Sequence, residues 1–88
     1  MSDPELLAVV RQGERYWFAS KQDAHPVVRY LHLNYARQAL EMALGGSPRA
    51  RITRLTGLNI DRRLEQVRRD QHAVAQHLIA LSRPGTLP

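Results

Sequence analysis

His25, Arg29 and His32 follow one another in steps of four and three residues, the spacing that places side chains on one strip of a helix. Imidazole and guanidinium groups on such a strip could bind an anion or a carboxylate of a partner protein. They do not form a metal site by themselves, because His25 and His32 would lie roughly 10 Å apart along the helix axis. The strip is therefore a candidate site for an anion or a partner protein.

A purely structural interpretation of the same strip stays open. Arg29 would then make one internal ion pair, and His32 would be a neutral histidine bonded to a carbonyl group. Burial of an arginine without a carboxylate is costly, so Arg29 needs an acid. The acids of the chain that we consider as partners are Glu5, Glu14, Glu65 and Asp70.

The remaining polar residues show no catalytic arrangement. His72 and His77 would point about 140° apart on a helix, so they do not form the i, i+4 pair of helical zinc sites. Asp61 and Glu65 stand among arginines and are expected to be salt-bridge partners. No glycine-rich phosphate loop is present. The sequence therefore predicts a protein without enzymatic activity, metal or cofactor.

Trp17 and His72 complete the candidate partner-binding residues. Trp17 stands between Tyr16 and Phe18, and such a tryptophan is more often a core anchor than a platform for a ligand. Three consecutive aromatic residues face different directions on a helix, so at least one is expected at a surface outside the core. His72 lies at the edge of the last predicted helix and is interpreted as an interface or packing residue.

The segment 49–69, RARITRLTGLNIDRRLEQVRR, resembles a helix-turn-helix: a short helix, a turn with Gly57, and an arginine-rich helix. The resemblance implies a regulator that binds DNA or RNA. With Gly57 in the turn, however, Leu64 and Val67 fall one position after the apolar positions of a recognition helix. The residues that would contact nucleic acid are Arg49, Arg51, Arg54, Arg62, Arg63 and Arg69.

Length and composition limit the class of protein. The chain has 88 residues, no cysteine, and a net charge of +5 from 13 Lys+Arg against 8 Asp+Glu. We expect one helical domain over residues 1–82, with a flexible tail at 83–88. No segment approaches the ~20 apolar residues of a membrane span, and the start of the chain is unlike a signal peptide. These features predict a cytoplasmic protein without a membrane partner.

Turn residues divide the chain into helices. A helix is expected from Pro4 to about Ser20, a second from Pro26 to the glycines at 45 and 46, a short third over 48–56, and a fourth after Asn59 that ends before Arg83. No segment alternates as a strand would. The predicted fold is all-α: a small bundle of three main helices and a short crossover helix. The second and last helices have matching lengths and are expected to form an antiparallel pair.

The second helix is apolar over more than half of its surface. One apolar sector contains Val27, Val28, Leu31, Tyr35, Ala39 and Met42, and the adjoining one contains Leu33, Ala36, Leu40, Ala43 and Leu44. The face expected in water consists of Tyr30, Asn34, Arg37, Gln38 and Glu41. A helix of this kind is expected to be covered on two sides, by other helices or by a second chain.

The last helix carries a heptad seam with one polar member, Gln71. A polar residue in such a seam costs stability and can fix register, so Gln71→Leu is expected to stabilise the protein and loosen its choice of assembly. Surplus apolar surface without a catalytic arrangement predicts a protein-protein interaction module: a small subunit, adaptor or assembly factor. Its expected partner is a second copy or a larger protein, and nucleic acid is the alternative.

Overall fold

The computed structural model describes residues 1–83, and this part of the chain folds into α-helices joined by short connections. The helices are α1 (Asp3–Gln22), α2 (Pro26–Gly46), α3 (Arg49–Thr56) and α4 (Ile60–Leu81). The predicted all-α class is therefore confirmed. The predicted flexible tail lies outside the described residues, except for Arg83.

Local side-chain chemistry fixes where the helices begin. The Ser2 hydroxyl accepts a hydrogen bond from the Glu5 amide at 3.3 Å, and the Asn59 side chain accepts one from the Arg62 amide at 3.1 Å. His25 caps α2, because its Nδ1 accepts from the Val27 amide at 3.2 Å. Gly57 ends α3 with a φ of 73°, a conformation that favours glycine. The predicted start of the fourth helix after Asn59 is thus confirmed.

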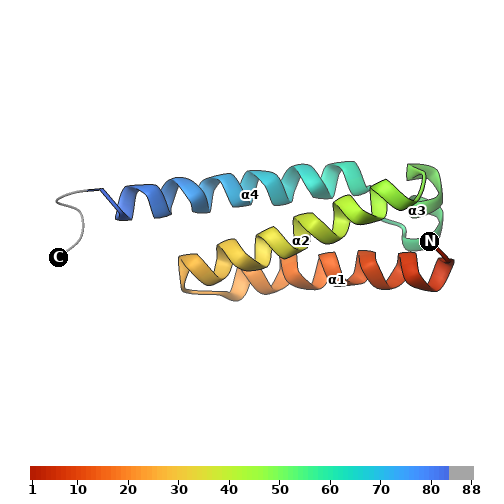
Figure 1. The fold of residues 1–88 in the computed structure, drawn as a ribbon, viewed down its shortest axis with the longest axis horizontal. Helices are drawn as coiled ribbons and strands as arrows, with labels where there is room; N and C mark the ends of the chain where they lie inside the picture. Colours follow the sequence, from red (N-terminus) through yellow and green to blue (C-terminus); the bar gives the residue numbers. More distant parts are fainter. Residues whose placement is uncertain (84–88) are drawn as a thin grey trace.

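The bundle is elongated, with extents of 51 × 17 × 17 Å. Figure 1 shows α2 running between α1 and α4 and antiparallel to both, with α3 at one end as the crossover. The predicted antiparallel pair of the second and last helices is therefore confirmed. α1 packs closely on α2, and it reaches α4 through long side chains such as those of Trp17 and Glu14.

The core lies where the three long helices face each other. Gly13 on α1 allows a close approach to α2, since a Cβ atom there would lie 2.8 Å from Leu40 Cδ2. Small residues on α2 contribute to the same close packing. The buried apolar side chains are Leu6, Val10, Trp17, Leu33, Ala36, Leu40, Ala43, Ile52, Ile60, Leu64, Val67 and Val74.

α2 turns a different face to α4 than the sequence predicts. Tyr30, Asn34, Arg37 and Glu41, expected in water, are half-buried, and the last three bond to α4. This packing is possible because the polar groups bond to one another across the two helices. Arg37 Nε donates to Gln71 Oε1 at 3.2 Å, and Arg37 Nη2 donates to Asn34 Oδ1 at 2.7 Å. We refer to Asn34, Arg37, Glu41, Arg68 and Gln71 as the Arg37 network.

Candidate functional site

The exposed residues of α2 are all neutral. Its charged residues and His32 are half-buried, whereas the exposed residues are Val27, Val28, Leu31, Tyr35, Gln38, Met42, Gly45 and Gly46. Leu31 is 43% exposed and Met42 is 59% exposed. The sector that the sequence places under a covering element is therefore open in the single chain. We call Val28, Leu31, Tyr35, Ala39 and Met42 the α2 stripe.

α1 extends this uncharged surface on one side. Ala8, Val9 and Gln12 of α1, with Ala39 and Met42 of α2, line a shallow hollow of about 340 Å³. Farther along, the rings of Tyr16 and Tyr35 lie 5.3 Å apart. Periodicity along α2 identified the stripe, but the contribution of α1 depends on how the two helices are rotated against each other.

The predicted strip at the start of α2 does not work as one unit. His25 is exposed and bonds to the α2 backbone, and His32 Nδ1 lies 2.5 Å from Asp23 Oδ2. Asp23 was not among the four acids considered, because it lies in the loop before α2, outside any helical periodicity. Those four bond elsewhere: Glu5 to Ser2, Glu14 to Arg63, Glu65 to Arg69 and Asp70 to Trp17.

Arg29 has no internal partner within residues 1–83. Its Nε is buried without a hydrogen bond, and none of the ion pairs in this part of the chain includes it. Arg29 lines a hollow of about 110 Å³ with Pro26, Ala73, Val74 and His77. The sequence did not pair Arg29 with His77, because only the antiparallel packing of α4 brings them together. An anion beside Arg29 stays a prediction.

Trp17 is buried between α1 and α4, as expected of a core anchor. Its Nε1 donates to Asp70 at 3.0 Å, and the Arg63 guanidinium lies 3.8 Å from the ring centre. The neighbouring Phe18 is exposed, which agrees with the expectation that one of the three aromatic residues faces outward. His72 is exposed on α4, so it belongs to a different helix from the α2 stripe.

Most arginines of the helix-turn-helix-like segment are held by carboxylates. Arg54 and Arg62 are exposed. Asp61 raises the pKa of Arg49 by accepting its hydrogen bond. The five arginines with acidic partners are Arg49 with Asp61 at 2.6 Å, Arg51 with Asp3 at 2.6 Å, Arg63 with Glu14 at 2.7 Å, Arg68 with Glu41 at 3.1 Å and Arg69 with Glu65 at 2.8 Å. These pairs reduce the positive charge available to a phosphate backbone.

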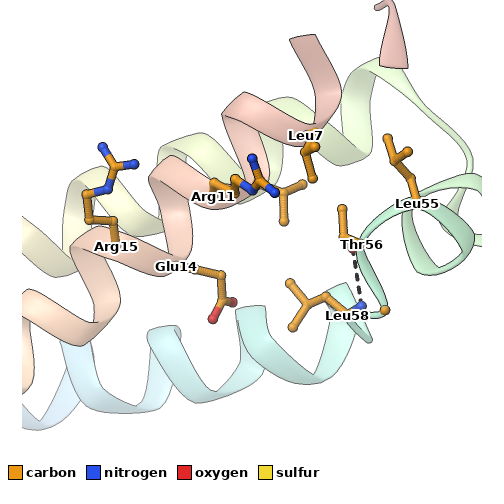
Figure 2. Close-up of a pocket in the computed structure, with 9 residues that line it drawn as sticks. Leu7, Arg11, Glu14, Arg15, Leu55, Thr56 and Leu58 are labelled. Atoms are coloured by element: carbon orange, nitrogen blue, oxygen red, sulfur yellow. Dashed lines mark hydrogen bonds between the residues drawn. The ribbon is translucent and has the colours of Figure 1, made fainter. Parts of the chain in front are cut away.

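A wider hollow of about 510 Å³ lies between α1 and the turn from α3 to α4. Figure 2 shows Glu14 pointing toward α4 and Arg15 pointing away from the hollow. Glu14 is bonded to Arg63, and the Thr56 hydroxyl donates to the Ile52 carbonyl and accepts from the Leu58 amide. Glu14 and Thr56 are thus already paired, and they do not form a nucleophile next to a base.

Within residues 1–83, no three His, Asp or Glu side chains come close enough together to hold a metal ion. None of the helices in this range combines the length and the apolar character needed to cross a membrane. Comparison with known proteins found no matching family model, no matching curated protein and no matching solved structure.

Proposed function

We propose that this protein is a non-catalytic interaction module that docks through the uncharged face formed by the α2 stripe and the adjoining part of α1. The observation that supports this proposal is that every exposed residue of α2 is neutral, although the chain has a net charge of +5. Depletion of charge together with exposed aromatic and methionine side chains is typical of the centre of protein interfaces. A subunit, adaptor or assembly factor would use such a face.

Burial supplies the driving force for docking. Leu31, Tyr35 and Met42 each expose apolar surface that would leave water in a complex, and burial contributes about 25 cal/mol for each Å². An isolated exposed leucine would need no explanation, but a continuous apolar stripe on one helix does. The charged side chains that could rim the interface lie on α1 and α4.

The test introduces a charge into the face. Leu31→Glu places a carboxylate in the stripe, and Ile79→Glu is the matched control because Ile79 is 50% exposed on α4. Native mass spectrometry of each variant, expressed in its source cells, is expected to show an assembly for the wild type and for Ile79→Glu, and a single chain for Leu31→Glu. A wild type that is a single chain, or an assembly that tolerates Leu31→Glu, overturns the proposal.

Nucleic-acid binding is the second candidate, favoured by the net charge and by the exposed Arg54 and Arg62. A titration with duplex DNA between about 50 and 200 mM salt tests it, because phosphate contacts lose affinity steeply over that range. Binding with a steep salt dependence that Arg54→Gln and Arg62→Gln weaken together would support this function. No binding at about 50 mM salt removes it.

A further inference from the structure

We propose that the occupant of the uncharged face is a second copy of this chain, which pairs with it about a twofold axis so that the two α2 helices run antiparallel and Tyr35 lies beside its symmetry mate. This inference rests on the proposed function and names its partner. The two observations that carry it are the spacing of the α2 stripe and the absence of charge on it.

The spacing of the stripe is symmetric about Tyr35. Leu31 and Ala39 stand four residues on either side of it, and Val28 and Met42 stand seven on either side. A twofold axis at Tyr35 therefore brings Leu31 of one copy to the height of Ala39 of the other, and Val28 to the height of Met42. A large side chain meets a small one at the first level, which is the alternation that close helix packing requires.

The uncharged α2 face is compatible with a second copy and gives an acidic partner no advantage. Two copies carry +5 each, so any contact through their charged surfaces is repulsive at close range. The α2 face is where they can meet without like charges opposite each other. An acidic protein would gain instead from contacts with the arginines, and α2 presents none on its outer surface.

The neighbouring part of α1 fits the same arrangement. The hollow of about 340 Å³ lies between α1 and α2 beside Ala39 and Met42. This is the height at which Val28 of the second copy arrives in the antiparallel pairing. Because α1 adjoins the stripe on one side in both copies, the pair forms a four-helix layer, the common way to bury two apolar helix pairs.

Single cysteines test the geometry, since the chain contains none of its own. Tyr35→Cys places two thiols across the axis, so mild oxidation is expected to give a covalent dimer. Val28→Cys alone is expected to stay monomeric under the same oxidation, because its two copies would lie roughly 21 Å apart along the helices, beyond the reach of a disulfide. The double variant Val28→Cys with Met42→Cys is expected to cross-link. Ile79→Cys is the control for random collision.

The outcomes separate this inference from the proposed function. Cross-linking of Tyr35→Cys and of the double variant, without cross-linking of Val28→Cys or Ile79→Cys, supports the antiparallel pair. Strong cross-linking of Val28→Cys alone indicates a parallel pair and overturns it. No Tyr35→Cys dimer, with an assembly that Leu31→Glu still abolishes, overturns the second copy while the interaction module stands. If the wild type is a single chain in native mass spectrometry, both proposals fail.

Discussion

The guanidinium group of Arg63 on α4 makes three interactions, and two of them, with Glu14 and Trp17, join α4 to α1. Its Nε donates to Glu14 at 2.7 Å, its Nη1 donates to Gln66 at 2.8 Å, and its plane covers the Trp17 ring. Arg63→Gln would leave Glu14 without its cation, and we expect the free energy of unfolding to fall by about 1–3 kcal/mol. Urea denaturation followed by Trp17 fluorescence measures the change. Arg62→Gln, at the exposed neighbour, is expected to change it by less than about 0.5 kcal/mol, and equal losses in the two variants would contradict the role of Arg63.

Glu41 makes stability depend on pH. The hydrogen bond from Arg68 is the main cause that lowers the pKa of Glu41, and Arg37 lowers it further against the opposing effect of burial. A carboxyl whose pKa is lower in the folded than in the unfolded state stabilises the fold above about pH 4.3, the unfolded value, and this contribution is lost as pH falls through the folded value. The wild type is therefore expected to lose more stability than Glu41→Gln between about pH 6 and pH 3. Thermal melts over this range measure it, and parallel profiles for the two proteins would contradict it.

At the scale of the helices, Gln71 connects α2 and α4. Its Oε1 accepts from Arg37 Nε at 3.2 Å and its Nε2 donates to Asn34 Oδ1 at 3.3 Å. The sequence alone predicts that Gln71→Leu stabilises the protein. The Arg37 network reverses this expectation, because leucine leaves the half-buried Nε of Arg37 without an acceptor and removes the hydrogen bond to Asn34. We expect a loss of about 1–3 kcal/mol in the free energy of unfolding.

Gln76→Leu is the matched control for Gln71→Leu, since Gln76 is exposed on the same helix. Its expected effect is within about 0.5 kcal/mol. Chemical denaturation of both variants distinguishes the two cases. A Gln71→Leu variant more stable than the wild type would show that the hydrogen bonds between α2 and α4 contribute less than apolar packing at this position.

The contact between α1 and α2 depends on Gly13. A Cβ atom at this position would lie 2.8 Å from Leu40 Cδ2 and 2.9 Å from Leu40 Cγ, so the packing must shift. Gly13→Ala is expected to lower the melting temperature, because overpacking of about 1–3 kcal/mol exceeds the gain in helix propensity of up to about 1 kcal/mol. Gly45→Ala, where a Cβ atom meets no neighbour within 4 Å, is expected to raise it. A rise for both variants would show that the two helices can separate without loss.

The helix boundaries were predictable because they depend on local chemistry. Ser2, His25 and Asn59 cap the helix that follows each of them, and proline or glycine marks the starts of α1 to α3 and the ends of α2 and α3. The α2 stripe was predictable as apolar but not as exposed. Two apolar sectors adjoin on this helix, and periodicity cannot tell which of them the chain buries itself. The partners of Arg63 and His32 lie in another helix or in a loop, so no spacing along α2 or α4 indicates them.

At the scale of the whole molecule, charge and apolar surface are separated. The exposed arginines of the helices lie on α1, α3 and α4, where acids neutralise several of them, and the exposed residues of α2 are neutral. Pairing through α2 thus buries apolar surface and keeps the charged surfaces in water. The same separation predicts how association responds to salt. Dissolved ions screen the repulsion between the net charges of the two copies and do not screen the apolar contact between their α2 helices.

Sedimentation equilibrium in about 0.05 M and about 0.5 M sodium chloride tests this prediction, since the Debye length falls from more than 10 Å to about 4–5 Å over that range. Each copy carries +5, so added salt weakens the repulsion between copies and leaves the apolar attraction in place. The dissociation constant of the pair is therefore expected to decrease as salt rises. An increase would mean that opposite charges supply the attraction, as the arginines would with an acidic partner, and would contradict assembly through the α2 face.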